Sequence, residues 1–546
     1  MSHTIRFLPE GTEAEAKNSI LETAIANGVH INSSCNGLGK CGKCRVIVQK
    51  GEFRAEPTEL LTQEEKKKGY ALACQSFPES DLEVLIPAES RLGEHQILER
   101  IDSGIAEMRK KSKSAGESLG LAIDIGTTTV VAYLTDLESG NIIDTESQLN
   151  KQSVFGADVL SRINQSKETG GLEKLNSLIL ENINGLTEIL LERNFFGDSK
   201  EHHIKKIVTA GNTVMTYLLL GRDPSVIQKN QQLEEFRQPA LNKAADIGID
   251  CGNPKAELYC LPGIANYVGG DIVADIMASG MHLSDGISML IDVGTNGEIA
   301  LGNKEFLITC STSAGPAFEG GETKHGMRAS TGAIEKVEID DDITYAVINN
   351  DRPRGICGSG LIDLISELFL NEIIDPKGKF ISDSRLSDRI RTGESGPEFV
   401  VVPREEAGID SDIVITEKDI ENIIITKAAI YAGASTLTRV GTPFDQLDKI
   451  YIAGGFGHYI NVERAIVLGL LPDLPKEKFE FIGNGSVLGA QLCLTSDEKR
   501  KEAQEIAKRA TYLDLSKERS FTEEYMNASY LPHNNMDLFP TVEEKL

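Results

Sequence analysis

The chain has 546 residues, of which 40% are hydrophobic and 25% are charged, as in a globular protein long enough for several domains. Its formal net charge of −27 and its pI near 4.9 argue against nucleic acid and against an anionic membrane surface as partners. No stretch approaches the roughly 18 apolar residues of a membrane-spanning helix, and the first residues lack the order of a signal peptide, so we expect a cytoplasmic protein without a membrane partner.

The first 90 residues alternate strand-like and helical patterns. Residues 3–8 predict a strand, and Asn18 or Ser19 is a suitable cap for a helix that continues to Ala26. Further strands are predicted at residues 45–48 and 82–86, where apolar and polar residues alternate. Several strands around one helix predict a small β-grasp domain over residues 1–90.

Four of the nine cysteines lie in this segment, at Cys35, Cys41, Cys44 and Cys74. Plant-type ferredoxins space their cluster ligands in a similar way, with four residues where this chain has five between the first two. Three glycines, Gly37, Gly39 and Gly42, lie between the first three cysteines and allow the backbone to curl around a metal centre. The spacing therefore predicts a [2Fe–2S] cluster held by the four cysteines.

Other interpretations of this loop are weaker. The glycines match a dinucleotide fingerprint and nearly match a phosphate-binding loop, but both motifs should follow a strand and open a helix, and this loop does neither. A structural zinc site is the serious alternative, although zinc prefers two close pairs of ligands. The other five cysteines, including Cys357, are expected to be small buried side chains.

Residues 91–118 are charged or small and lack an apolar period toward their end, so they predict a linker that tethers the first domain. From Leu119 to about residue 515, strands and helices alternate, which predicts a large α/β region followed by a C-terminal tail, 516–546. Two near copies, IDIGT at residues 123–127 and IDVGT at 291–295, indicate two related halves, about 119–285 and 286–515.

Three segments of the α/β region have the pattern of a nucleotide site, and each follows an apolar strand. In the first, Asp124 is placed to hold Mg²⁺ through water, and a turn exposes amides and hydroxyls to phosphate oxygens. The second repeats this design at Asp292, and in the third, glycines allow an adenosine to lie flat against the backbone. The predicted ATP contacts are Gly126, Thr127, Thr128, Gly294, Thr295, Asn296, Gly454, Gly455, Phe456 and Gly457.

Residues 1–90 resemble the plant-type ferredoxins, which implies one-electron transfer through the four cysteines. The three nucleotide segments resemble the actin, sugar-kinase and Hsp70 ATPase superfamily, which implies a two-lobed ribonuclease-H-like fold that closes over ATP and Mg²⁺. By that resemblance, residues 155–158, which end in Asp158, and residues 423–440 connect the lobes. The expected fold is α+β and multidomain: a β-grasp ferredoxin, a linker and the ATPase.

The combination resembles one family, the ATP-dependent reductive activators of corrinoid proteins. Further strings match that family: GNTVM at 211–215, GGD at 269–271, AGPAFEGG at 314–321, GICGSG at 355–360 and LPH at 531–533. The resemblance implies one-electron reduction of Co(II) to Co(I) in the corrinoid protein of a methyltransferase system, supplied by a low-potential electron donor, and it leaves a homodimer open. An extra small domain of some members has no room in the linker.

Two carboxylates are expected to serve ATP hydrolysis, Asp292 by orienting the attacking water and Asp124 on the metal side. Asp158 is a further candidate for positioning the metal or the water. His325 and His458 are better interpreted as ordinary histidines than as cobalt ligands. Three alternatives stay open from the sequence: an activator of the dehydratase-activase type, a redox-regulated small-molecule kinase, and an actin-like scaffold that binds nucleotide without turnover.

Overall fold

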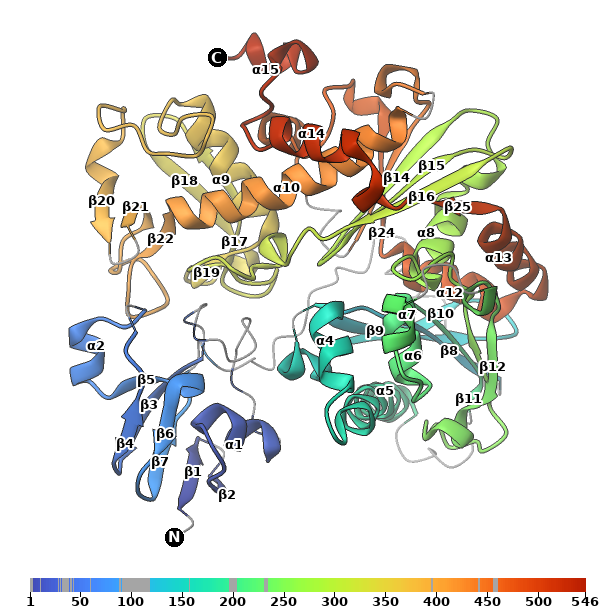
Figure 1. The fold of residues 1–546 in the computed structure, drawn as a ribbon, viewed down its shortest axis with the longest axis horizontal. Coiled ribbons are helices and arrows are strands. Elements are labelled where there is room, and N and C mark those ends of the chain that lie inside the picture. The colour runs from blue at the N-terminus through green and yellow to red at the C-terminus, as the bar shows by residue number, and fades with distance from the viewer. Residues whose placement is uncertain are drawn as a thin grey trace.

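The computed structural model describes residues 3–9, 11–27, 29, 31, 39, 42, 44–58, 60–87, 90, 118–156, 158–195, 204–229, 234–393, 396–439, 442–454 and 460–546. Figure 1 shows a small N-terminal domain beside two larger α/β lobes. The predicted linker, except Ser118, lies outside the described residues.

The N-terminal domain is built on a five-stranded sheet in the order β2-β1-β7-β3-β5. Its strands are Thr12–Glu15, Thr4–Leu8, Leu82–Leu85, Arg45–Lys50 and Tyr70–Leu72. Strands β1 and β7 run parallel, and the other pairs are antiparallel. Helix α1 (Ile20–Ala26), capped by the Ser19 side chain, buries Ile20, Leu21 and Ala24 in the domain's core. This mixed sheet with its helix is the predicted β-grasp arrangement.

The first lobe contains a six-stranded sheet in the order β10-β9-β8-β11-β13-β12. Its strands are Ile142–Leu149, Thr129–Asp136, Leu119–Ile125, Ile204–Gly211, Glu257–Cys260 and Ala240–Lys243. Helices α4 (Val159–Ser166), α5 (Gly171–Asn194) and α6 (Thr213–Leu219) share the core on one face.

The second lobe repeats this plan with a six-stranded sheet in the order β24-β23-β14-β15-β16-β25. Its strands are Phe479–Gly483, Ile450–Ala453, Ser288–Val293, Gly297–Gly302, Leu307–Thr312 and Ala510–Tyr512. Strand β8 pairs antiparallel with β9 and parallel with β11, and β14 pairs antiparallel with β15 and parallel with β23. The near copies in the sequence thus end equivalent central strands, which agrees with two related halves.

Two helices lie between the lobes, α8 (Gly270–Ser279) and α12 (Gly485–Thr495). Their apolar residues share one core with Ala122 and Val208 of the first sheet and with Leu290 and Ala300 of the second. Because both sheets bury a face against this layer, the ends of β8 and β14 are held opposite each other.

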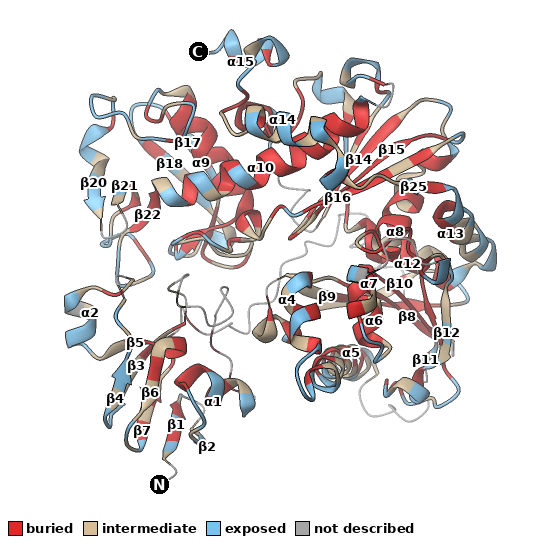
Figure 2. Ribbon diagram, viewed as in Figure 1, coloured by how far each residue is buried: buried red, intermediate tan, exposed pale blue. Residues whose placement is uncertain are grey.

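The outer part of the second lobe surrounds helix α10 (Glu417–Thr438), which is buried along most of its length (Figure 2). It starts six residues before the predicted helix because Thr416 and Asp419 form a reciprocal capping box. Beside it lie α9 (Gly358–Leu370), α11 (Val462–Leu468) and two three-stranded sheets. These sheets consist of β17 (Ala333–Ile339), β18 (Ile343–Val347), β19 (Gly355–Ile356), β20 (Ile390–Gly393), β21 (Gly396–Val402) and β22 (Ile413–Thr416).

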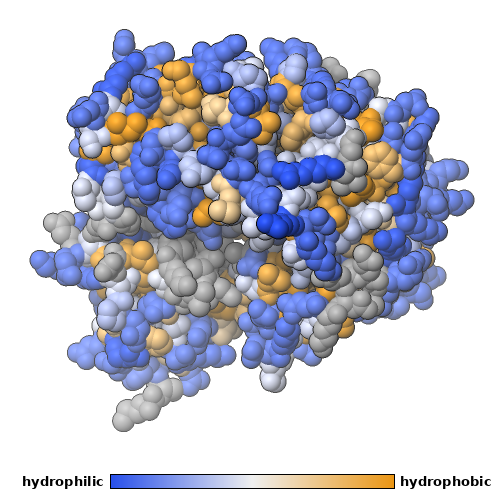
Figure 3. Space-filling model, turned by 45° about the horizontal axis from the view of Figure 1, so that its top comes forward, coloured by the Kyte–Doolittle hydropathy of each residue, from blue (hydrophilic) through white to orange (hydrophobic). Residues whose placement is uncertain are grey.

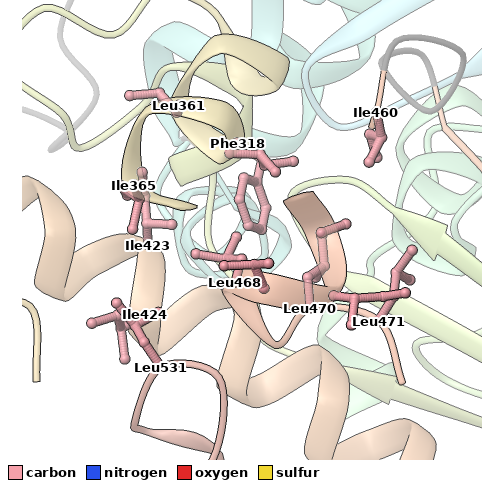
Figure 4. Close-up of a cluster of buried hydrophobic side chains, with 14 of the residues drawn as sticks. Phe318, Leu361, Ile365, Ile423, Ile424, Ile460, Leu468, Leu470, Leu471 and Leu531 are labelled. Atoms are coloured by element: carbon pink, nitrogen blue, oxygen red, sulfur yellow. The ribbon is translucent and has the colours of Figure 1, made fainter. Parts of the chain in front are cut away.

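The predicted C-terminal tail is folded onto this lobe. Helix α14 (Arg519–Ala528) packs against α10, and α15 (Pro540–Glu543) follows it. Leu531, Phe539 and Val542 are buried in the lobe's core. Figure 4 shows Leu531 beside Ile424, in the cluster that also contains Phe318.

Every helix in the described part of the chain is too short or too polar to cross a membrane. On the face shown in Figure 3, hydrophilic residues separate small groups of hydrophobic ones.

Candidate functional site

The N-terminal domain brings Cys44 and Cys74 together, with 3.3 Å between their Sγ atoms. Cys44 directly precedes β3, and Cys74 lies in a short 3-10 helix, Ala73–Gln75. The Ala73 amide donates to the Cys44 carbonyl (2.8 Å), which fixes the two segments side by side. Both side chains are buried, and their separation is far longer than the 2.05 Å of a disulfide. Cys35 and Cys41 lie outside the described residues.

Gly39 and Gly42, the two glycines described before Cys44, have the backbone conformation expected of them. Gly39 and Gly42 have φ values of +71° and +67°, in the left-handed region that favours glycine. A Cβ atom on Gly39 would lie 2.9 Å from the side chain of Gln75, whose amide nitrogen is 3.7 Å from the Cys74 sulfur. Amide donors near thiolates stabilise the anionic sulfur, so these residues fit a cluster site.

The two predicted phosphate turns meet across a cleft between the lobes. The cleft contains about 1300 Å³ of space, open solvent included, and its walls include Asp124, Gly126–Thr128, Asp292 and Gly294–Asn296. The hydroxyls of Thr128 and Thr295, one from each lobe, are 2.8 Å apart. The Thr295 hydroxyl donates in turn to Glu319 Oε1 (2.7 Å). Thr128 and Thr295, which are 167 positions apart in the sequence, thus belong with Glu319 to one continuous series of hydrogen bonds.

The first turn is tied back on the side away from the cleft. Asn150 Nδ2 donates to the Gly126 carbonyl, and the Asn150 amide donates to the Thr128 carbonyl, both at 2.9 Å. The fully buried guanidinium of Arg162 donates to the Thr127 carbonyl. With its carbonyls engaged in this way, the turn leaves its hydroxyls and amides for a ligand.

Carboxyl groups concentrate at the base of the cleft. Asp292 lies at the end of β14, and burial together with the charge of Asp271 raises its pKa to about 7. Asp275 is 1% exposed, and burial with the charges of Asp292 and Asp271 raises its pKa well above the ordinary range. Burial also raises the pKa of Asp271 to about 6. Such a cluster is stabilised by a divalent cation, which counters the repulsion between the carboxylates.

The described residues contain no group of three His, Cys, Asp or Glu side chains placed to hold a metal ion. Asp124 accepts a hydrogen bond from Asn484 Nδ2 at 2.9 Å. Mg²⁺ commonly keeps several waters and contacts one or two carboxylates, so the cleft fits the water-mediated contact expected at Asp124.

The third predicted segment is described only at Gly454. Its φ is +108°, and a Cβ atom there would lie 2.5 Å from the Val293 carbonyl oxygen, so glycine is required where the strand meets the second phosphate turn. Gly454 lines the cleft, whereas Gly455, Phe456, Gly457 and His458 lie outside the described residues.

Several residues of the cleft were not selected from the sequence. The strings GNTVM, GGD and AGPAFEGG hold three of them, Asn212, Asp271 and Glu319, and were noticed only as family matches. Asp275 and Glu298 carry no local signal, because they lie inside a helix and a strand that the fold turns toward the cleft. Arg328, Asn484, Gly485 and Ser486 also line it, as does Cys357, whose burial was expected.

Two residues considered from the sequence have other surroundings. Asp158 caps α4 by accepting from the amide and hydroxyl of Ser161, at 2.9 and 2.7 Å. His325 packs beside β22, where its Nδ1 accepts from the Val414 amide at 3.0 Å. Neither residue lines the described cleft.

Family models match three consecutive parts of the chain. A 2Fe-2S iron-sulfur cluster binding domain matches residues 6–79, the RACo middle region matches 119–284, and the C-terminal domain of RACo, the ASKHA domain, matches 286–543. The first match favours the cluster over zinc, and together they confirm the predicted fold class of a ferredoxin joined to an actin-like ATPase fold.

Individual proteins are similar along most of the chain or nearly all of it. The corrinoid activation enzyme RamQ of Eubacterium limosum is 31% identical, over 97% of this chain and 99% of its own. The Co(II) methylated amine-specific corrinoid protein reductase of Methanosarcina barkeri is 26% identical, over 74% and 76%. A solved structure of a reductive activator for corrinoid, iron-sulfur protein is 38% identical, with a TM-score of 0.72 over 99% of this chain and 100% of that chain.

Proposed function

This chain belongs to the family of ATP-dependent reductive activators of corrinoid proteins, and from that membership we propose that it reduces the cobalt of a partner corrinoid protein from Co(II) to Co(I). One observation carries the proposal: a single chain holds a pair of adjoining cluster cysteines and, in its other domain, two phosphate turns that face each other. When bound, the cluster supplies the single electron of this reduction.

ATP is needed because such an electron moves uphill from an ordinary donor. For a one-electron step, about 59 mV corresponds to about 1.4 kcal/mol, so a gap of about 200 mV requires about 5 kcal/mol. Coupling nucleotide binding and hydrolysis to docking of the corrinoid protein supplies free energy of this size by changing the axial ligation of the cobalt. A low-potential donor then reduces the cluster again.

We assign the roles within the cleft as follows. Asp124 acts on the metal side through water, and Asp292 orients the attacking water. Residues Gly126–Thr128 and Gly294–Asn296 hold the phosphates from opposite lobes, and Gly454–Gly457 support the adenosine. The hydrogen bond between Thr128 and Thr295 and the acidic cluster around Asp292 support these assignments.

The proposed organisation is a ferredoxin domain at 1–90, a linker at 91–118, an ATPase at 119–515 with lobes meeting near residue 285, and a C-terminal segment at 516–546. The protein is proposed to work in the cytoplasm. A homodimer is the proposed oligomeric state, and sedimentation in solution would test it.

The proposal is tested by mixing the anaerobic, cluster-loaded protein with a reductant, ATP and Co(II) corrinoid proteins, and following Co(I) in the visible spectrum. Cys74→Ser should lose Co(I) formation with its cluster spectrum while still binding ATP. Asp292→Asn should keep the cluster spectrum and lose ATP turnover by more than about 100-fold, the usual scale for a catalytic group.

Three outcomes would contradict parts of this proposal. No Co(I) with any methyltransferase partner, while the cluster is intact, would reject the proposed reaction. Transfer of phosphate to a small acceptor would favour the kinase alternative. Unchanged ATP turnover in Asp292→Asn would reject the assignment of that residue alone.

A further inference from the structure

The residues lining the cleft carry many more negative than positive charges, although the proposed ligand, ATP, is itself an anion. Its walls contain six carboxyl groups, but among the described residues on those walls Arg328 is the sole cation. The carboxyl groups belong to Asp124, Asp271, Asp275, Asp292, Glu298 and Glu319. A triphosphate is itself strongly anionic, so its terminal phosphate needs a cation besides Mg²⁺ in this setting.

The Arg328 side chain is available to a ligand, because neither a hydrogen bond nor an ion pair joins its guanidinium to another residue that the structure describes. Burial lowers the pKa of Arg328, and the neighbouring Glu319 carboxylate opposes that shift. A guanidinium has five N–H donors, and leaving them unpaired while partly removed from water is unfavourable. The arrangement is therefore suited to an anionic ligand.

Arg162, the other arginine near Glu319, shows the contrast. Its guanidinium donates to the Thr127 carbonyl, to the Gly156 carbonyl (3.1 Å) and to Gln152 Oε1 (3.1 Å). Those contacts support the first phosphate turn from behind, and Arg162 is not among the residues lining the cleft. Arg328 is thus the arginine that a nucleotide can reach.

The backbone holds Arg328 in place. The Met327 amide donates to the Ile356 carbonyl (2.9 Å), and the Ile356 amide donates to the His325 carbonyl (2.8 Å). The chain then runs from Ile356 directly into α9, whose first residues, Gly358 and Ser359, line the same cleft. The positive end of this 13-residue helix lies on the same wall as the guanidinium.

The position relative to the phosphate turns follows from Glu319. Its carboxylate accepts from Thr295, which bonds Thr128 of the opposite turn, and the same carboxylate influences Arg328. The neighbouring Phe318 is anchored in the hydrophobic cluster of Figure 4, which fixes this part of the wall. Arg328 therefore lines the cleft close to the place where the two turns meet.

We propose that Arg328, assisted by the N-terminus of α9, binds the terminal phosphate of ATP and stabilises the charge on the phosphoryl group during hydrolysis. This inference rests on the proposed ATP site. Water attacks the terminal phosphorus, the bond to the bridging oxygen breaks, and ADP and phosphate are released. Arg328 donates hydrogen bonds and neither gains nor loses a proton. A planar guanidinium suits phosphate oxygens better than an ammonium group does.

The test measures ATP and ADP binding by calorimetry on the full, cluster-loaded protein with Mg²⁺, together with ATP turnover in the presence of the corrinoid partner. Arg328→Gln should weaken ATP binding by about 10-fold or more, change ADP binding by less than about twofold, and reduce turnover further, since a charge-assisted contact is lost. Arg328→Lys, which keeps the charge, should fall between Arg328→Gln and the wild type. Arg352→Gln, on the exposed surface of the same lobe, is the matched control and should behave as the wild type.

The outcomes separate this inference from the function on which it rests. Equal losses for ATP and ADP, or no loss for either, in Arg328→Gln would overturn the assignment to the terminal phosphate. Wild-type protein that binds no ATP would overturn the proposed function itself and the inference with it.

Discussion

His325 illustrates how its surroundings decide what a single histidine can do. Burial lowers its pKa to about 4; the contact of its Nδ1 with the Val414 carbonyl (3.2 Å) and the charge of Glu398 oppose this shift, whereas the charges of Lys324 and Arg45 add to it. The ring is therefore neutral at pH 7, and its Nδ1 is engaged with the Val414 amide. A histidine held in this way stabilises the contact between its loop and β22.

A pH dependence follows from this shift. The unfolded chain binds a proton at His325 near pH 6.5, but the folded chain does so only near pH 4, so stability is fully present above pH 6.5 and falls as the pH drops toward 4. The loss reaches at most about 3 kcal/mol, from about 1.36 kcal/mol per pKa unit. Thermal unfolding of the wild type and of His325→Asn, compared from pH 8 to pH 4.5, should show a shallower decline in the variant.

The two proteins should respond alike to pH between 7 and 8, where the histidine is neutral in both states. Carboxyl groups, among them Asp292 with its pKa of about 7, also titrate over the measured pH range, so the difference between the two curves, rather than either curve, reports on His325. Parallel curves down to pH 4.5 would contradict the assignment.

The site residues that could be predicted from the sequence are those that stand in a short, recognisable pattern. Cys44 and Asp124 stand in short patterns whose spacing follows from ligand geometry or from a strand followed by a turn. Asp275 and Arg328 have no such pattern, since only packing of α8 and the bridge at Ile356 directs them to the cleft. Their roles depend on contacts between distant parts of the chain, which a single sequence does not display.

At the scale of an element, Lys427 holds the C-terminal segment against the second lobe. It is fully buried in α10, and its Nζ donates to the carbonyls of Tyr530 and Pro532 at 2.5 and 2.6 Å. A Cβ atom on Gly469 would lie 2.9 Å from the same Nζ, so the amine is closely surrounded. One side chain thus fastens the connection between α14 and α15 to the second lobe.

Replacing this amine should release the segment. Lys427→Met keeps the length and apolar part of the side chain but leaves two buried carbonyls without their donor, which should destabilise the protein by about 2–4 kcal/mol. Limited proteolysis should then cut between α14 and α15, and the thermal midpoint should fall. Lys418→Met, on an exposed position of the same helix, is the control and should change neither.

Equal protease resistance in Lys427→Met and Lys418→Met would show that apolar packing at Leu531 and Phe539 holds the segment without the amine. From the sequence, residues 516–546 were predicted only as a tail that follows the α/β region. Their partners lie about 100 residues earlier, on α10.

At the scale of the molecule, two lobes with related sheets share the layer of α8 and α12, so they are joined firmly on one side. At the phosphate turns, hydrogen bonds also connect the lobes, through the hydroxyls of Thr128 and Thr295 and, beside them, from Asn484 to Asp124. The repeat at residues 123–127 and 291–295 was sufficient to predict two halves with facing turns. It was not sufficient to predict that α12, near the C-terminus, would cover the first sheet, since that crossing depends on how the sheets pack.

The donor and the acceptor of each hydrogen bond between Thr128, Thr295 and Glu319 follow from the number of protons available. Each threonine hydroxyl has one proton, and the Thr295 proton goes to the Glu319 carboxylate, so Thr128 must donate to Thr295. Removing Thr128 deletes one hydrogen bond, and removing Thr295 deletes two. The lobes should therefore separate more readily in Thr295→Val than in Thr128→Val.

A typical net contribution of about 1 kcal/mol for each bond corresponds to about a fivefold change in the population of an open state. Hydrogen exchange of the amides in the two turns, measured without nucleotide, should increase in the order wild type, Thr128→Val, Thr295→Val, while the cluster spectrum stays unchanged. Thr145→Val, on the edge strand β10, should match the wild type. Equal exchange in both cleft variants would mean that the α8 and α12 layer alone sets the distance between the lobes. The predicted order would instead show that the hydrogen bonds between the two phosphate turns control how closely the lobes approach each other. Because ATP competes for the same hydroxyls, its binding would then change the position of both lobes.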